Sequence, residues 1–328
     1  MYGVIKGTGS AVPVNRITND DLAKTLDTND TWIRERTGIG CRHVISGDEK
    51  TDTLAAEACR NALQMAGMKA EEIELILLAT TSPNRILPSI SCSVQNLIGA
   101  KNAACIDMNA ACSGFVFAYQ TAQAYMQCGI YKKILVIGAD TISSLVDWKD
   151  RSSCILFGDA AGAVVLEAAD AKEEVVPYFG VMHSDGVGGW SMQMESRNQN
   201  PIPEIEKTYI QMNGKEIFKF AVTRVPQVIG EALKKAGKSV EEVDLFLLHQ
   251  ANGRMIEAIA RRMKQPMEKF PLNVEEYANS SSGTIPLLMD QLNRAGRLKQ
   301  GDKIVLCGYG AGLSWGAVYM EWQKNNPV

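Results

Sequence analysis

Two stretches of the chain share one pattern: a segment with helical periodicity, then a glycine, then a short apolar run. Residues 61–78 read NALQMAGMKAEEIELILL, and residues 231–248 read EALKKAGKSVEEVDLFLL. Each amphipathic segment ends at a glycine, Gly67 or Gly237, as helices commonly do. The apolar runs ELILLAT and DLFLLHQ are continuous rather than alternating, which is typical of strands covered on both faces by helices. The pattern therefore predicts an α/β protein.

The two stretches are copies of each other at one constant offset, which aligns position 61 with position 231. Nine of their 18 positions are identical without a gap, and the same offset aligns the later segments KKILVIG and DKIVLCG. One offset that holds without a gap from position 61 to position 138 indicates a duplication. We therefore expect two stacked halves, residues 1–171 and 172–328, each built around a central sheet.

Reactive side chains differ between the two copies at corresponding strand ends. The offset aligns His249 with Ala79 and Cys112 with Ser282, and it aligns two asparagines, Asn279 and its counterpart at position 109. In open α/β sheets, ligands gather at the carboxyl ends of strands. If the halves pack about a pseudo-twofold axis, Cys112, His249 and Asn279 face a common cleft.

Composition and charge exclude several classes of protein. The 328 residues are 46% hydrophobic, enough for a sizeable core, and the formal net charge of −3 gives no footprint for nucleic acid. The N-terminus MYGVIKGTGS lacks the pattern of a secretory signal, and no apolar run reaches the ~18 residues of a membrane span. The eight cysteines show neither CxxC pairs nor zinc spacing. We expect a cytoplasmic protein with reduced thiols, no metal site and no membrane contact.

Cys112, in DMNAACSGF, precedes a long apolar segment that is typical of a buried helix. A free cysteine is most often an inert core residue, but at a helix N-terminus the thiolate is favoured and can attack carbonyls. Of the three histidines, His249 stands at a strand end, whereas His43 and His183 lie in stretches typical of surface and loop. The alternatives are a structural histidine at 249 and a helix-capping asparagine at Asn279.

Six motifs together resemble the β-ketoacyl-acyl carrier protein synthase III family, the initiating condensing enzymes of bacterial type II fatty acid synthesis. They are NDTWIRERTGI, NAACSGF, FGDAAGA, HQAN, ANSSSGTIP and GYGAGLSWG, and they span nearly the whole chain. The resemblance implies the thiolase fold, two duplicated α-β-α-β-α halves stacked in five layers, and a homodimer. It also implies that acyl-CoA and malonyl-acyl carrier protein are substrates and that no cofactor is needed.

The resemblance implies a mechanism with Cys112 as the acyl acceptor. Malonyl-acyl carrier protein then loses carbon dioxide, and its carbanion attacks the acyl-Cys112 thioester to give a 3-oxoacyl-carrier protein. His249 and Asn279 would donate hydrogen bonds to the malonyl thioester oxygen, where negative charge develops. The backbone N–H groups of Cys112 and Gly312 would form the oxyanion hole for acyl transfer.

The same resemblance assigns binding residues. Contacts to CoA fall on Thr28, Trp32, Arg36, Arg151 and Asn252. Trp32 and Arg151 would sandwich the adenine, which suits a flat aromatic ring opposite a planar guanidinium. Carrier-protein docking falls on Lys219, Gln250, Ala251, Asn252, Gly253 and Arg254, within a local basic surface. Leu87 stands where the family often carries an aromatic residue that limits the acyl pocket, which hints at primers longer or bulkier than acetyl.

Three other functions compete with this interpretation. GYGAGLSWG superficially resembles a dinucleotide-binding motif, but position 313 is leucine and no βαβ unit follows, so a dehydrogenase is disfavoured. A related synthase or acyltransferase of secondary metabolism would keep the nucleophile and use another malonyl donor or acceptor. An inactive binding protein would not need Cys112, His249 and Asn279 together.

Overall fold

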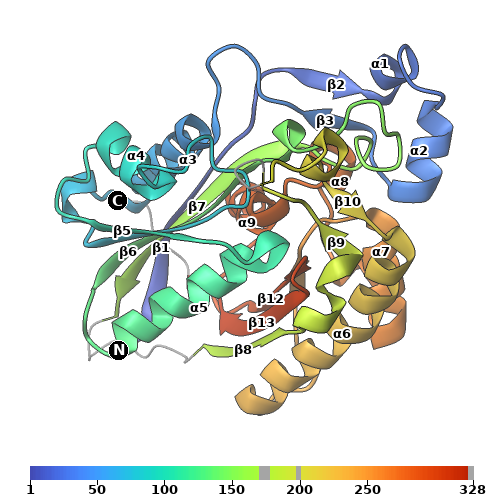
Figure 1. The fold of residues 1–328 in the computed structure, drawn as a ribbon. Coiled ribbons are helices and arrows are strands. Elements are labelled where there is room, and N and C mark those ends of the chain that lie inside the picture. Colours follow the sequence, from blue (N-terminus) through green and yellow to red (C-terminus); the bar gives the residue numbers. More distant parts are fainter. Residues whose placement is uncertain (170–177, 197–200, 324–328) are drawn as a thin grey trace.

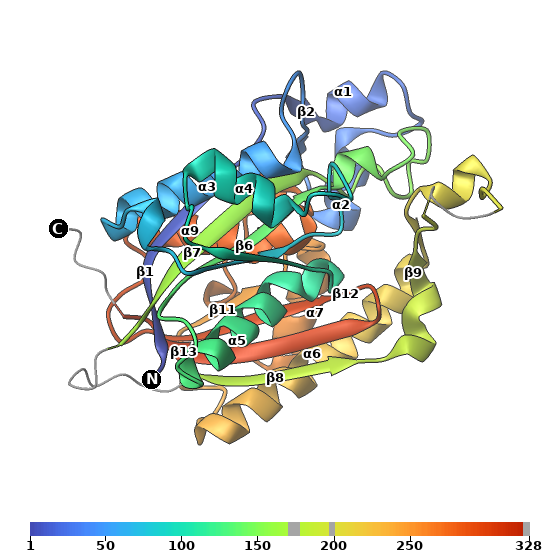
Figure 2. The ribbon, with the colours of Figure 1, turned by 60° about the vertical axis from the view of Figure 1, so that its left-hand side comes forward.

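The computed structural model describes residues 1–169, 178–196 and 201–323, which stack in five layers of alternating helices and sheets (Figures 1 and 2). Two helices, α3 and α4, cover the outer face of a five-stranded sheet. Helices α5 and α9 fill the space between this sheet and a four-stranded one, whose outer face packs against α6 and α7. The bounds of these helices are α3 Thr51–Ala66, α4 Ile90–Ile98, α5 Gly114–Gln127, α6 Gly214–Ala236, α7 Gly253–Met263 and α9 Thr284–Arg294.

The first sheet has the strand order β1-β7-β6-β4-β5, and the second has the order β11-β12-β13-β8. The first contains β1 Gly3–Ala11, β7 Asp159–Ala168, β6 Lys133–Thr141, β4 Leu75–Ala79 and β5 Ala104–Met108. The second contains β11 Leu245–Leu248, β12 Lys303–Gly310, β13 Ser314–Glu321 and β8 Phe179–Ser184. The two predicted apolar strands, β4 and β11, pair in parallel with β6 and β12. Their continuous apolar character follows from burial on both faces.

The predicted duplication is visible element by element. Helices α5 and α9 begin at equivalent positions of the two copies, as do β4 and β11, and α3 and α6 end at equivalent positions. Gly67 and Gly237 follow α3 and α6 with φ angles of 62° and 65°, in the left-handed conformation that glycine adopts without strain. The copies differ at β5, because the equivalent residues form the short helix α8, Val274–Tyr277. Glu275 and Glu276 stand there at the positions that Cys105 and Ile106 occupy in β5.

A set of short elements lies over one end of the layers (Figure 1). It comprises β2 Arg16–Thr18, α1 Asn19–Ala23, α2 Asp30–Thr37, β3 Cys41–His43, β9 Met192–Gln193 and β10 Gln211–Met212. Apolar side chains in these elements and in the links between them, among them Ile33 and Ile39, form a separate cluster with Phe157. The predicted boundary between the halves, at residues 171 and 172, lies outside the described residues and stays a prediction.

Candidate active site

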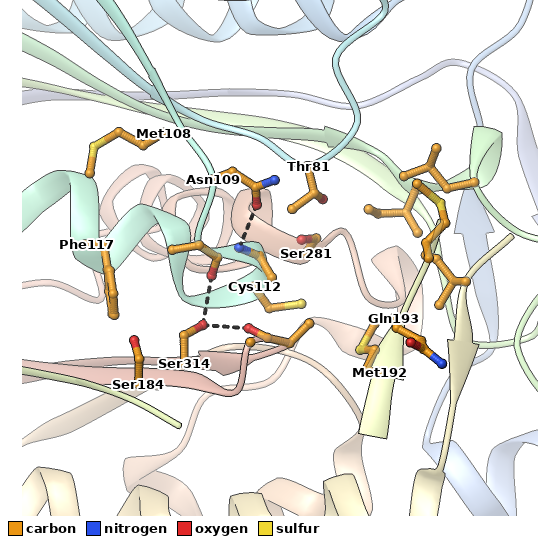
Figure 3. Close-up of a pocket in the computed structure, with 18 of the residues that line it drawn as sticks. Thr81, Met108, Asn109, Cys112, Phe117, Ser184, Met192, Gln193, Ser281 and Ser314 are labelled. Atoms are coloured by element: carbon orange, nitrogen blue, oxygen red, sulfur yellow. Dashed lines mark hydrogen bonds between the residues drawn. The ribbon is translucent and has the colours of Figure 1, made fainter. Parts of the chain in front are cut away.

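Cys112 lies in a short 3-10 turn, Ala111–Ser113, between β5 and α5 (Figure 3). The turn begins with Ala111 at a φ of 46°, a region that residues other than glycine seldom adopt. The side-chain oxygen of Asn109 accepts a hydrogen bond from the Ala111 N–H at 3.3 Å, and the Ser113 hydroxyl donates to the Ala110 carbonyl at 2.7 Å. A backbone conformation as strained as that of Ala111 persists only where the surrounding contacts hold it in place. These contacts hold Cys112 just ahead of α5, where the residue is 5% exposed.

The second half repeats this turn at Ser281–Gly283. Ser281, the counterpart of Ala111 in the second copy, has a φ of 52°, and its N–H donates to the side-chain oxygen of Asn279 at 2.8 Å. The Asn279 backbone is held by Leu156 and Gly158, through two hydrogen bonds of 3.0 Å. Because the turn occupies the amide oxygen, the NH₂ group of Asn279 is left to face the cavity that this side chain lines.

Each turn packs against a glycine in a strand of the other half. A Cβ atom at Gly138, in β6, would lie 2.2 Å from the carbonyl oxygen of Ser282. A Cβ atom at Gly308, in β12, would lie 2.8 Å from the Cα atom of Ser113. The buried carboxylate of Asp140 accepts hydrogen bonds from the N–H and hydroxyl of Ser282, at 3.0 and 2.6 Å. These contacts bring the two turns together, as the duplication predicted.

His249 follows the carboxyl end of β11 and is 1% exposed. The backbone N–H of His249 donates to the Cys307 carbonyl at 2.9 Å, and its backbone carbonyl accepts from the Tyr309 hydroxyl at 3.0 Å. The ring meets the Tyr309 ring edge-on, with centroids 5.2 Å apart, and its Nδ1 lies 2.7 Å from the hydroxyl of Thr284. Burial lowers the pKa of His249 to about 3. The imidazole is therefore neutral near pH 7.

One cavity brings the three predicted catalytic side chains together. This His249 cavity, of about 310 Å³, is lined by Cys112, His249 and Asn279, and it extends to Trp32 and Asn252. It opens into a shallow basic depression that also borders Asn252 and is lined by Arg36, Lys215 and Arg254. A cationic entrance leading to a buried thiol suits a ligand with phosphates at one end and a reactive group at the other.

A second cavity, of about 760 Å³, also reaches Cys112 (Figure 3). Apolar side chains line most of this apolar cavity, among them Met108, Phe117, Ile142, Leu145, Met192 and Ile210. Polar groups lie along it at Thr81, Asn109, Ser184 and Gln193, and Gly312 borders it beside Ser314. Cys112 thus lies between the His249 cavity, which leads toward the basic depression, and the apolar cavity.

The environment of Cys112 corrects one prediction. Burial raises the pKa of its thiol to about 12, although the Ser281 side chain, through a hydrogen bond, acts in the opposite direction. Burial therefore favours the neutral thiol over the thiolate expected at a helix N-terminus. The resting Cys112 is a neutral thiol beside a neutral His249.

The predicted CoA residues gather around α2. The guanidinium carbons of Arg36 and Arg151 lie 4.4 and 5.1 Å from the centre of the Trp32 ring. An intervening adenine needs about 7 Å, twice an ordinary stacking distance, so Arg151 would have to move outward by about 2 Å. The Thr28 hydroxyl is buried and makes no hydrogen bond to any described residue. Asn252 caps α7 and donates from its amide to the Arg36 carbonyl at 3.2 Å.

The docking residues divide into exposed and buried ones. Lys219 and Arg254 are exposed on the neighbouring helices α6 and α7, while Ala251 is partly buried and lines the His249 cavity. Gly253 is buried, as is Gln250, whose exposure is 0%. The Gln250 amide is used internally, donating to the Leu248 carbonyl at 2.9 Å. The prediction that Gln250 touches a carrier protein is therefore wrong, because it has no accessible surface.

Other predicted positions lie away from the cavities. Leu87 is 85% exposed and lines neither cavity, so this chain does not by itself bring it to the acyl pocket. His43 binds the Pro13 carbonyl at 2.7 Å, and exposed His183 pairs with Glu231, which agrees with their exclusion from the site. Sequence analysis missed Thr284 and Tyr309, the partners of His249. Their contacts depend on the packing of α9 and β12, which no local motif reveals.

Within residues 1–169, 178–196 and 201–323, no group of three or more His, Cys, Asp or Glu side chains is arranged to hold a metal ion. Among the helices of the same residues, none has both the length and the apolar character to cross a bilayer.

Comparison with known proteins identifies the family. Residues 106–186 match the family model described as 3-oxoacyl-[acyl-carrier-protein] synthase III, and residues 233–322 match the model of its C-terminal part. A β-ketoacyl-[acyl-carrier-protein] synthase III of Clostridium acetobutylicum is 44% identical over 98% of each chain.

Solved structures agree with this assignment. The 3-oxoacyl-[acyl-carrier-protein] synthase III of Aquifex aeolicus VF5 superimposes with a TM-score of 0.91 at 39% identity, covering 98% of this chain and 100% of that one. The priming β-ketosynthase of the R1128 polyketide pathway gives a TM-score of 0.93 at 31% identity, covering 100% of this chain and 97% of that one. These similarities confirm the predicted thiolase fold, and the chain belongs to the β-ketoacyl-[acyl-carrier-protein] synthase III family.

Proposed function

We propose that the chain condenses an acyl-CoA primer with malonyl-acyl carrier protein, giving 3-oxoacyl-acyl carrier protein, carbon dioxide and CoA. The observation that carries this proposal is the position of Cys112 between the His249 cavity and the apolar cavity. A thioester at Cys112 would place its acyl chain in the apolar cavity. The same thioester would face His249 and Asn279, where the second substrate would arrive.

The first half-reaction transfers the acyl group to Cys112. CoA enters through the basic depression, with its adenine between Trp32 and Arg151 and its pantetheine arm past Asn252. The Cys112 sulfur attacks the thioester carbon, the bond to the CoA sulfur breaks, and the thiol proton passes to the departing CoA sulfur. The N–H groups of Cys112 and Gly312 stabilise the oxyanion of the tetrahedral intermediate.

The second half-reaction forms the carbon–carbon bond. The malonyl group loses carbon dioxide, and the electron pair of the broken bond moves onto the thioester oxygen as an enolate. The NH₂ group of Asn279 and the ring of His249 donate hydrogen bonds to this oxygen, each worth about 10²–10³ in rate by analogy with measured oxyanion holes. The enolate carbon then attacks the acyl-Cys112 carbon, and the Cys112 sulfur leaves and regains a proton from water.

Exposed Lys219 and Arg254 would receive the acidic carrier protein beside the cavity entrance, on α6 and α7. A homodimer fits the first sheet, because β5 is an edge strand with exposed Ala104 and Ile106. A second copy of this chain is the partner that we propose for that edge. The cytoplasmic location remains a prediction from the sequence.

A kinetic experiment tests the proposed reaction. The wild-type enzyme should release carbon dioxide from malonyl-acyl carrier protein, and Asn279→Ala should slow this release by about 10²–10³. Asn102→Ala, which alters an exposed asparagine on the surface, is the matched control and should change nothing. Equal carbon dioxide release by the Asn279 and Asn102 variants would contradict the proposal.

The alternative is a related enzyme of secondary metabolism with another malonyl donor or acceptor. The same experiment with malonyl-CoA in place of the carrier protein separates the two. Faster turnover with malonyl-CoA would favour the alternative, and condensation without carbon dioxide release would indicate a simple acyltransferase.

A further inference from the structure

The ring of His249 is held from one side by the first residue of α9, Thr284. Its Nδ1 lies 2.7 Å from the Thr284 hydroxyl oxygen, and that oxygen lies 2.9 Å from the Ser281 carbonyl oxygen. Thr284 is 2% exposed, so water does not compete for these contacts. The other ring nitrogen, Nε2, makes no hydrogen bond to any described residue, and the ring lines the His249 cavity.

A single proton therefore decides what His249 presents to the cavity. Burial keeps the imidazole neutral near pH 7, so one ring nitrogen carries a hydrogen and the other is an acceptor. The Thr284 hydroxyl also has one hydrogen, which goes either to Nδ1 or to the Ser281 carbonyl. Donation to Nδ1 leaves an N–H on Nε2, whereas donation to Ser281 leaves Nε2 bare.

We propose that Thr284 is a positioning residue whose hydroxyl donates to Nδ1 of His249 and so keeps the ring hydrogen on Nε2. The contact to Nδ1 is the shorter of the two that the hydroxyl makes. This assignment rests on the proposed function, because only a hydrogen on Nε2 lets a neutral His249 stabilise the enolate oxygen. Acyl transfer to Cys112 does not need that donor.

Loss of the hydroxyl should reverse the tautomer. The Ser281 backbone lies close enough to the ring to act on its pKa as a hydrogen-bond partner. Once Thr284 cannot donate, the Ser281 carbonyl, which is purely an acceptor, favours a hydrogen on Nδ1. A bare Nε2 would then face the thioester oxygen, and two lone pairs would repel each other.

Nitrogen NMR of the resting protein tests the assignment directly. The chain has three histidines, and the His249 signals are those lost in His249→Asn. Wild type and Thr284→Ser should carry the hydrogen on Nε2, and Thr284→Val should carry it on Nδ1. Wild type with the hydrogen on Nδ1, or Thr284→Val with the wild-type tautomer, would overturn the proposal.

Kinetics separate this proposal from a structural role and from the proposed function. Thr284→Val should slow malonyl decarboxylation by about 10²–10³ while Cys112 acylates at the wild-type rate, and Thr284→Ser should restore decarboxylation. An equal loss of both half-reactions in Thr284→Val would contradict the positioning role. If wild type forms no acyl-Cys112, the proposed function fails, and the NMR result still decides the tautomer.

Discussion

The contacts between each turn and the opposite half predict that two glycines control different half-reactions. Gly138 in β6 touches Ser282, in the turn that carries Asn279. Gly308 in β12 touches Ser113, in the turn that carries Cys112. A Cβ at Gly138 would also lie 3.3 Å from the Cβ of Phe115 in α5, but the closest backbone clash falls on one turn in each case, so an added methyl group should mainly displace that turn.

The size of each displacement follows from the distances. A Cβ at Gly138 would lie 2.2 Å from the Ser282 oxygen, and relief needs a shift of about 1 Å or more. A Cβ at Gly308 would lie 2.8 Å from the Ser113 Cα atom, which needs a shift of about 0.7 Å. Overpacking of this kind costs about 1–3 kcal/mol of stability, and a 1 Å misplacement of a reacting group costs about 10²-fold in rate.

The assay measures the half-reactions separately. Gly138→Ala should acylate Cys112 nearly normally and release carbon dioxide about 10²-fold more slowly, whereas Gly308→Ala should be slow in acylation. Gly230→Ala is the matched control, because that glycine is exposed within α6 and an added Cβ meets no atom within 4 Å. Equal losses in both half-reactions for both variants, with folding intact, would refute this reasoning.

Three further outcomes are expected. Because burial raises the pKa of Cys112 to about 12, the rate at which Cys112 is alkylated should rise about tenfold per pH unit from pH 7 to 10. Peptide mass spectrometry measures this rate, with exposed Cys92 as the reference. A plateau in the rate below pH 9 would contradict the burial argument. Trp32→Ala should raise KM for acyl-CoA about tenfold and leave KM for the matching acyl-pantetheine unchanged, because only CoA offers an adenine to stack; equal changes would remove the adenine assignment. Because Leu87 is exposed and would reach an acyl pocket only in the proposed homodimer, Leu87→Phe should reduce the use of branched or longer acyl-CoA relative to acetyl-CoA in the dimer, and unchanged relative rates would show that this position does not limit the acyl pocket.

The sequence predicted the scaffold because the duplication is recorded at a constant offset. Gly67 and Gly237 mark equivalent helix ends, and the apolar runs of β4 and β11 follow them directly. The positions of Cys112 and Asn279 could be inferred because both stand in equivalent turns of the repeated frame, although Asn279 follows the short helix α8 rather than a strand. The structure brings both to the cavity that His249 lines.

The remaining features depend on packing between segments far apart in the chain. The raised pKa of Cys112 comes from its burial, which a helix-terminus argument alone does not capture. The family motif assigns Gln250 to the docking surface, yet its side chain is buried and donates a hydrogen bond to the Leu248 carbonyl. Thr284 contacts His249 from a distant part of the sequence, so its role emerges only when α9 is placed against the end of β11.

Intact-protein mass spectrometry after mixing with a panel of acyl-CoAs tests the central claim most directly. The account predicts that wild type gains the mass of one acyl group, that malonyl-acyl carrier protein removes it, and that Cys112→Ser gains none. An adduct that persists in Cys112→Ser, or an acyl-enzyme that malonyl-acyl carrier protein leaves untouched, would contradict it.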